Sequence, residues 1–239
     1  MNLDEDYHVH SLFSDGVSTL NENVRAARNR GLRRLCLVDH VRRDTAWVPH
    51  FVAAVRPLRE TAGIEIRAGV EAKILNRAGR LDLPGDPDAL AGIDLVLIAD
   101  HQFPADLGPV PPREMRAAIS SGKLSPQEAI GWLAEATASA MGRVRRPVLA
   151  HLFSVLPKLG LAESDVPDQV LSLLARRASD TGALVEVNEK WCCPSASTLR
   201  AFAAVGVRLV ASTDSHDCAD VGVYDSVART LDAVFPGAA

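Results

Sequence analysis

The sequence predicts an α/β protein in which helices cover a parallel sheet, and it favours a barrel of seven β/α units. Short, almost continuously apolar segments alternate with longer segments of helical character about seven times, as expected when strands are buried on both faces. Nearly every apolar segment is followed by a histidine or a carboxylate. The length of 239 residues suits one α/β barrel. A doubly wound open sheet has the same alternation and remains the alternative.

The first half of the chain is expected to hold four strands, at residues 7–11, 33–38, 64–70 and 94–99. Thr19 and Glu22 form a capping-box pattern that opens the first helix, and Gly31 closes it. The second helix is expected over 48–62, where Pro57 predicts a kink or an early end. The pattern also allows a hairpin through 76–79 and a short helix over 87–91.

The second half is expected to add three strands, at 147–150, 183–188 and 207–211. Prolines and glycines punctuate residues 102–124, which predicts one long loop of the kind that often serves as a functional lid. Helices are expected over 125–141, 167–181, 194–206 and 223–234. Because no segment has the composition of a linker, residues 1–239 are expected to form a single domain.

Composition narrows the class of protein. The net charge of −4 and the absence of a long basic tract do not favour a nucleic-acid partner. The four cysteines lack C-x-x-C spacing, which fits a reducing compartment, and Cys36 lies in an apolar run, so it is expected to be a buried thiol. No apolar run approaches a membrane span and no signal peptide is evident. The expected location is the cytoplasm, without a membrane partner, and nothing in the sequence indicates an oligomeric state.

Six of the seven histidines fall at the C-terminal end of an expected strand. His8 and His10 are two residues apart, so their side chains share one face of the first strand. In a parallel α/β barrel the C-terminal strand ends form the face that holds the active site. The polar residues expected to meet there are His8, His10, Asp15, Asp39, His40, Glu71, Asp100, His101, His151, Asp214 and His216.

This concentration of imidazoles and carboxylates predicts a metal centre. One histidine at a strand end is more often a hydrogen-bonded structural residue, but so many on one rim exceed what ordinary packing can satisfy, since buried charges need partners or metal. Mixed nitrogen and oxygen ligands without thiolate suit Zn, Mn, Fe or Co. About eight or nine ligands are too many for one tetrahedral ion, so two or three divalent ions are expected.

These residues resemble the PHP (polymerase and histidinol phosphatase) superfamily, in chain order from residue 7 to about residue 222. The resemblance implies a distorted (β/α)7 barrel with a trinuclear metal centre. Chain size implies a small stand-alone phosphoesterase. The motifs that carry it are His8-Val9-His10-Ser11, Ser14-Asp15-Gly16, Val38-Asp39-His40, Gly69-Val70-Glu71, His101, Ala150-His151, Glu186-Val187-Asn188 and Ser212-Thr213-Asp214-Ser215-His216.

The resemblance also implies a role for each ligand. Glu71 would bridge two ions, and Asp39 would orient a neighbouring histidine from behind. Asn188 would be a further supporting residue around the ligands. The implied ligand sets are His8, His10, Glu71 and Asp214 for one ion, Glu71, His101 and His151 for a second, and Asp15, His40 and His216 for a third.

The chain departs from the family pattern at two places. Asp100 stands before His101 where relatives usually have a small residue, so a supporting carboxylate is expected beside the site. The segment Leu152-Phe153-Ser154 lacks a proline often found there. An extra carboxylate could retune the ions or repel a phosphate, which leaves metal binding expected and bears on the choice of substrate.

Basic residues just past the strand ends are candidates for binding a phosphate. For any one of them a solvated side chain is the competing interpretation, and at least one is expected to contact substrate. Trp191 could line the substrate pocket or belong to the core. The four basic candidates are Arg42, Arg43, Lys73 and Lys190.

The predicted function is hydrolysis of phosphate esters at this centre, with a metal-bound water or hydroxide as the attacking group and no protein nucleophile. A small phosphorylated metabolite, such as histidinol phosphate or a nucleotide, is the expected substrate, and the ions are expected to be Zn, Mn or Fe. Three alternatives remain: hydrolysis of an amide or cyclic ester at the same cluster, an exonuclease-like phosphodiesterase, and a non-catalytic metal-stabilised module.

Overall fold

The computed structural model describes residues 3–235, and its centre is a single seven-stranded parallel sheet. The strand order follows the chain. Val9 pairs with Ser215 in a further parallel bridge, which joins the first strand to the segment after the last one. This bridge nearly closes the sheet, so the barrel is confirmed over the open sheet. The strands are β1 (Glu5–Val9), β2 (Arg34–His40), β3 (Glu65–Lys73), β4 (Leu95–Ala99), β7 (Pro147–Leu149), β8 (Leu184–Asn188) and β9 (Leu209–Ser212).

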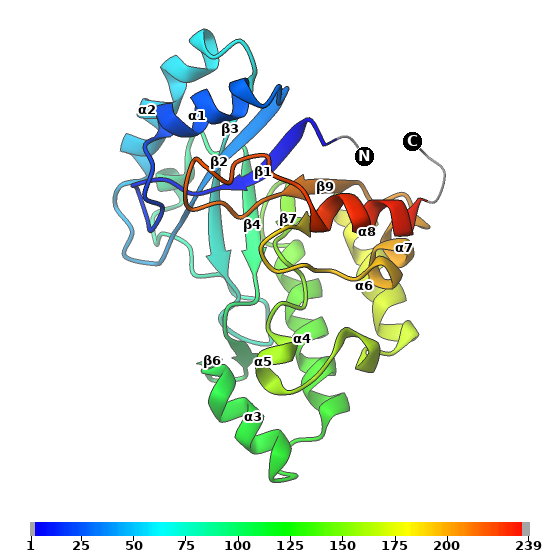
Figure 1. Cartoon of the computed structure of the whole chain (residues 1–239). Helices are drawn as coiled ribbons and strands as arrows, with labels where there is room; N and C mark the ends of the chain where they lie inside the picture. The colour runs from blue at the N-terminus through cyan, green and yellow to red at the C-terminus, as the bar shows by residue number, and fades with distance from the viewer. Residues whose placement is uncertain (1–2, 236–239) are drawn as a thin grey trace.

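Helices cover the outside of this sheet (Figure 1). The predicted capping box is confirmed, because the Thr19 hydroxyl accepts a bond from the Glu22 amide and Glu22 bonds back to the Thr19 amide. Pro57 does not end its helix, which continues to Thr61. The covering helices are α1 (Leu20–Asn29), α2 (Val48–Thr61), α4 (Pro126–Met141), α6 (Asp168–Thr181), α7 (Ala196–Ala203) and α8 (Ser226–Val234).

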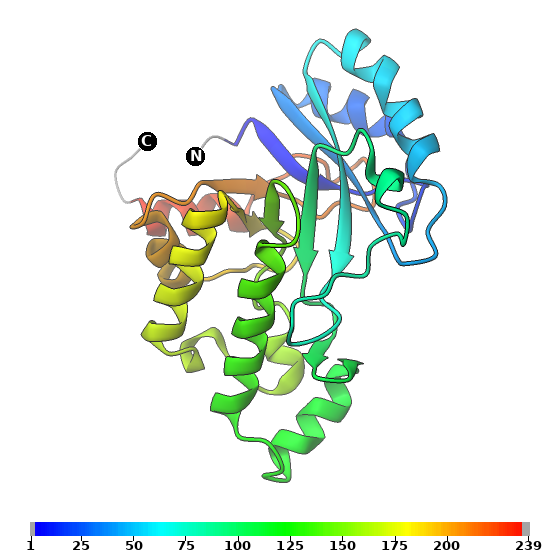
Figure 2. The same cartoon turned by 180° about the vertical axis from the view of Figure 1, so that it is seen from behind.

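The expectation of one long loop over 102–124 is wrong. This segment contains an antiparallel hairpin, β5 (Phe103–Ala105) with β6 (Gly108–Val110), and helix α3 (Pro112–Ser120). Prolines often interrupt helices, but Pro112 occupies the first helical turn, where a missing N–H costs nothing. Figures 1 and 2 show this unit beyond the C-terminal ends of β3 and β4.

Shorter helical pieces complete the chain. A short helix at 87–91 was expected, and a 3-10 turn spans Pro87–Leu90. The single-turn helix α5 (Leu156–Leu159) and a 3-10 turn at Glu163–Asp165 follow β7 and had no counterpart in the sequence prediction. The hairpin through 76–79 is present as a bridge between Ile74 and Leu81. No helix within residues 3–235 is long and apolar enough to cross a membrane.

The barrel interior is apolar in its middle layer and polar at its C-terminal end. Side chains alternate along each strand, so β2 sends Cys36 and Val38 inward before His40, and β3 sends Gly69 inward before Glu71. The Gly69 position is crowded, since a Cβ there would stand 2.7 Å from a Leu95 methyl carbon. The apolar layer therefore fills the barrel, and the next inward residue on each strand is a candidate ligand.

A bulge in β1 sets the direction of its histidines. Asp6 pairs with Leu35 while Val9 pairs with Leu37, so β1 has one residue more than β2 over this stretch. Tyr7 packs in the barrel interior, whereas Val9 packs outside against the helices. Without the extra residue, regular alternation from Tyr7 would turn His8 away from the interior. Bulges commonly redirect side chains beside active sites in this way.

Candidate metal centre

Glu71 is the centre of the cluster at the C-terminal ends of the strands. Its carboxylate is 1% exposed, and five imidazoles from four other segments surround it. Because these residues follow different parallel strands, their convergence comes from the barrel itself. The distances from a Glu71 oxygen are 2.9 Å to His40 Nδ1, 3.0 Å to His101 Nε2, 3.0 Å to His151 Nε2, 3.3 Å to His8 Nε2 and 3.5 Å to His10 Nε2.

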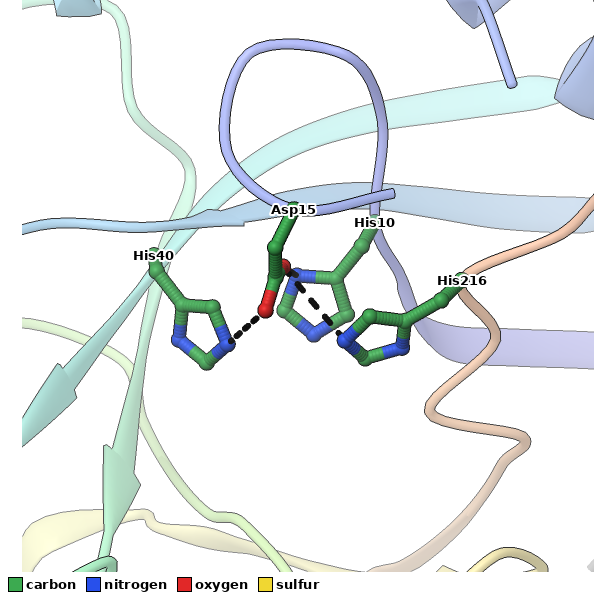
Figure 3. A group of neighbouring side chains, drawn as sticks. All are labelled: His10, Asp15, His40 and His216. Carbon is green, nitrogen blue, oxygen red and sulfur yellow. Dashed lines mark ion pairs between the residues drawn. The ribbon is translucent and has the colours of Figure 1, made fainter. Parts of the chain in front are cut away.

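A second group of donors surrounds Asp15 (Figure 3). The Asp15 carboxylate points between two imidazoles, 3.4 Å from His40 Nε2 and 3.4 Å from His216 Nε2. His10 Nδ1 lies 3.8 Å from the same carboxylate, and His10 Nε2 lies 3.4 Å from Asp214. Three groups have ligand atoms close enough for one ion: His8, His10 and Glu71; His40, Glu71 and His101; His10, Asp15, His40 and His216.

The donor chemistry fits bound cations. Within residues 3–235, both ring nitrogens of the buried His10 lack a hydrogen-bond partner. Native proteins leave few buried polar groups unsatisfied. Metal ligation would satisfy at least one of these two nitrogens. The nine residues predicted as ligands all belong to this cluster.

Burial and opposite charges set the protonation of each residue in the cluster. Burial alone would raise the pKa of Glu71, but the charges of His8 and His101 hold that pKa well below its usual range. Burial lowers the pKa of His10 to about 4, so this imidazole is neutral at pH 7. Burial opposes protonation of His8 and His151, but nearby carboxylates raise the pKa of His8 well above its usual value and that of His151 to about 10. Because metal binds neutral imidazole, ligation at these two residues would release protons.

The sequence prediction missed Glu186 as a member of the site. This fully buried carboxylate stands behind the ligands, with Oε1 2.9 Å from His8 Nδ1 and Oε2 accepting the His151 amide at 3.0 Å. Asn188, two residues later on the same face of β8, donates to Glu186 at 3.2 Å. The signal available was this pair of polar residues at i and i+2 in an otherwise apolar strand.

The contacts of Asp39 differ from the prediction that this carboxylate orients a histidine. Its Oδ1 accepts bonds from the Ser11 amide at 2.9 Å and the Ser14 hydroxyl at 2.6 Å, and its Oδ2 accepts the Ser11 hydroxyl at 2.6 Å. Asp39 alternates with the inward His40 and so faces the turn after β1. It therefore holds the turn that carries Asp15, and it acts on the ligands through that turn.

Replacing Gly16 by alanine is expected to displace the same turn. A Cβ at Gly16 would stand 2.8 Å from both the His10 carbonyl carbon and the Ser11 nitrogen. Backbone atoms cannot yield as a flexible side chain does, so the free energy of unfolding should fall by about 1–3 kcal/mol, and metal binding should weaken. Thermal unfolding and metal titration measure both effects. The control is Gly85→Ala, whose Cβ meets nothing within 4 Å; equal effects for the two variants would contradict this account of the turn.

Asp100 stands behind His151. The Ser154 hydroxyl donates to Asp100 Oδ1 at 2.7 Å and lies 3.0 Å from His151 Nδ1, which is 3.5 Å from Asp100. The segment that lacks the usual proline thus supplies Ser154. His151 and Phe153 have φ of 32° and 73°, a left-handed conformation that is costly for side-chain-bearing residues and clusters at functional sites.

The four basic candidates lie in different surroundings. Arg42 and Lys73 line a cavity of about 610 Å³ beside the cluster, together with Trp47, Thr45 and several ligands. Lys73 Nζ is 3.5 Å from Asp82. Arg43 lines a neighbouring cavity, and its amide bonds Asp82. Lys190 is nearest to the cluster, with Nζ 3.4 Å from Asp214 Oδ1 and 3.1 Å from His216 Nδ1.

Sequence comparison finds relatives that are named as phosphatases. A protein named probable phosphatase from Vibrio vulnificus strain YJ016 is 29% identical over 98% of this chain and 86% of its own length. A probable phosphatase from Caldanaerobacter subterraneus is 26% identical over 96% of this chain and 82% of its own length. A crystal structure from Bacteroides vulgatus, described as a two-domain protein containing a predicted PHP-like metal-dependent phosphoesterase, covers 90% of this chain and 52% of that chain at 14% identity, and its TM-score of 0.44 is too low to bear on the assignment. Residues 6–123 match the family model of the PHP domain, and this match confirms the resemblance to the PHP superfamily that the sequence motifs indicate.

Proposed function

We propose that this protein is a metal-dependent phosphomonoesterase that acts on a small phosphorylated molecule. The observation that carries the proposal is the set of five imidazoles around the buried Glu71 carboxylate, with both nitrogens of the buried His10 left without hydrogen-bond partners among the described residues. The match to the PHP family model and the names of the relatives support a phosphatase over other hydrolases. The site also opens onto a cavity large enough for a small organic phosphate.

The proposed ions number two or three and are Zn, Mn or Fe. Shared ligands such as Glu71 and His10 favour neighbouring ions over separate ones, because each belongs to more than one donor group. When bound, such ions lower the pKa of water and stabilise negative charge on phosphoryl oxygens. The residues that would hold them are His8, His10, Asp15, His40, Glu71, His101, His151, Asp214 and His216.

The remaining side chains prepare the site for that chemistry. Glu186 and Asp100 fix the His8 and His151 rings from behind, so that each ring presents Nε2 to Glu71. Loss of a hydrogen bond that supports a metal ligand from behind typically changes metal affinity or activity by about 10–100-fold. Arg42, Lys73 and Lys190 supply positive charge for the substrate phosphate. The proposal includes no protein nucleophile.

The direct test is an assay of the purified protein against a panel of phosphate esters with added Mn²⁺, Zn²⁺ or Fe²⁺. Release of inorganic phosphate from monoesters supports the proposal. Cleavage of bis(p-nitrophenyl) phosphate without monoester hydrolysis would move the assignment to a phosphodiesterase. Turnover of an amide or lactone panel alone would move it to the other hydrolase class, and metal binding with no turnover in any panel would favour a structural module.

Lys190 is expected to contact the substrate phosphate, so Lys190→Ala should lower kcat/KM. Its side chain is 44% exposed and reaches the cluster from the rim, which leaves its ammonium able to turn toward a ligand. A charge-assisted hydrogen bond contributes about 1.5–3 kcal/mol, which corresponds to a loss of roughly 10–100-fold. Steady-state kinetics measure it, with Lys123→Ala between α3 and α4 as the control. Unchanged kcat/KM in Lys190→Ala would remove Lys190 from the binding site.

A further inference from the structure

Trp191 makes a direct hydrogen bond to one of the candidate ligands. Its indole Nε1 donates to Asp214 Oδ2 at 2.7 Å. Asp214 is 5% exposed, so this bond lies in a partly desolvated environment, where a bond to an ionised group is strong. Trp191 follows β8 and Asp214 follows β9, and the bond therefore ties together two neighbouring strand ends. The indole therefore supports a candidate ligand from behind, a contact that neither the sequence nor the family pattern indicated.

The indole is itself held on several sides. The Trp191 amide donates to Asn188 Oδ1 at 3.0 Å, which fixes the turn after β8. Lys158 Nζ, from α5, lies 4.2 Å from the centre of the indole ring, in a cation–π contact. The His151 ring lies 5.7 Å away. Although 37% of Trp191 is accessible to solvent, these contacts hold its indole in place.

The two oxygens of Asp214 are thereby distinguished. Oδ2 is taken by the indole, while Oδ1 lies 3.4 Å from His10 Nε2, 3.6 Å from His216 Nδ1 and 3.4 Å from Lys190 Nζ. The backbone of Asp214 has φ of 53°, an uncommon conformation for aspartate that needs support from its surroundings. A carboxylate free to rotate could offer either oxygen, or both, to the cluster.

We propose that Trp191 is a positioning residue that reserves one oxygen of Asp214, so that this ligand presents a single oxygen to the metal centre. The proposal rests on the proposed function only in requiring that metal binds. Lys158 assists by holding the plane of the indole. In this arrangement α5 and the turn after β8, both outside the ligand set, control the geometry of a ligand that follows β9.

The test is metal binding by the whole protein with Trp191→Phe, which keeps an aromatic ring but removes the N–H donor. Apparent affinity for Mn²⁺ is expected to fall by about 10–100-fold, the usual effect of losing an outer hydrogen-bond partner. Lys158→Met should weaken binding in the same direction by a smaller factor. The matched control is Trp132→Phe, because Trp132 lies on α4 and contacts Arg77 and Phe103. The unfolding temperature of the metal-free protein is measured for every variant.

Fluorescence supplies a readout that a purely structural role would not change. With Trp47→Phe and Trp132→Phe combined, Trp191 is the sole tryptophan, and paramagnetic Mn²⁺ should quench it as the site fills. With Trp47→Phe and Trp191→Phe combined, the remaining Trp132 should not respond. These measurements need no substrate, so they stand even when no phosphate ester is hydrolysed. Unchanged Mn²⁺ affinity in Trp191→Phe, or a Trp191 emission that ignores Mn²⁺, would overturn the proposal.

Discussion

A Glu71→Gln variant is expected to bind at least one ion fewer per chain and to lose nearly all phosphatase activity. Glutamine keeps the size of the side chain but removes the negative charge on which five imidazoles converge. Metal ions contribute several kcal/mol of transition-state stabilisation, and each 1.36 kcal/mol is tenfold in rate, so a loss of about 10³-fold or more is expected. Elemental analysis and the phosphatase assay measure the two effects.

The matched control for this variant lies on the same strand. Glu65 also sits on β3, six residues earlier, at the opposite end of the barrel. It is 41% exposed and pairs with Arg34 and Arg67. Glu65→Gln should therefore keep metal content and activity, with only a small loss of stability. Full metal content and activity in Glu71→Gln would show that Glu71 does not hold the centre.

An Asp6→Ala variant is expected to be strongly destabilising, although Asp6 lies outside the ligand set. The buried Asp6 carboxylate accepts bonds from the Thr213 hydroxyl at 2.7 Å, the Thr213 amide at 3.0 Å, the Gly222 amide at 3.0 Å and the His8 amide at 3.3 Å. It therefore closes the seam between β1 and the segment after β9. Leaving these donors without an acceptor costs about 1–3 kcal/mol each.

The expected loss for Asp6→Ala is at least about 3 kcal/mol, because the separate costs are not fully additive. For a chain of this size that corresponds to a fall in Tm of roughly 6–12 °C. Asp4→Ala, two residues away, is the control: Asp4 pairs with the exposed Arg33, and its loss should cost less than about 1 kcal/mol. Equal shifts in calorimetry for the two variants would show that the seam does not depend on Asp6.

The sequence predicted the barrel because its strands are apolar runs that end in histidine or carboxylate, and this pattern depends only on burial and period. It could not predict the bulge before Val9, since the extra residue is defined only by pairing with β2. The sequence also does not predict α3, because clustered prolines are typical of loops, whereas Pro112 begins this helix. Both misses depend on context that short-range patterns do not contain.

The candidate ligands were predictable for the same reason, as each follows a strand and strand ends share a face. The supporting contacts were not. Trp191 bonds Asp214 from the neighbouring strand end, Ser154 reaches Asp100 across 54 positions, and Asp39 bonds the turn of Asp15 in place of an imidazole. These contacts depend on side-chain direction after the fold has formed, which no spacing in the sequence specifies.

The central claim is that the cluster around Glu71 holds divalent ions that hydrolyse phosphate esters. The most direct measurement is stepwise addition of Mn²⁺ or Zn²⁺ to the protein stripped with a chelator, with bound metal and phosphate release recorded at each step. We predict no phosphate release from the stripped protein, recovery of activity as ions are added, and saturation at two or three ions per chain. Full phosphatase activity in the stripped protein would contradict the account. So would activity that reaches its maximum while no ion is bound.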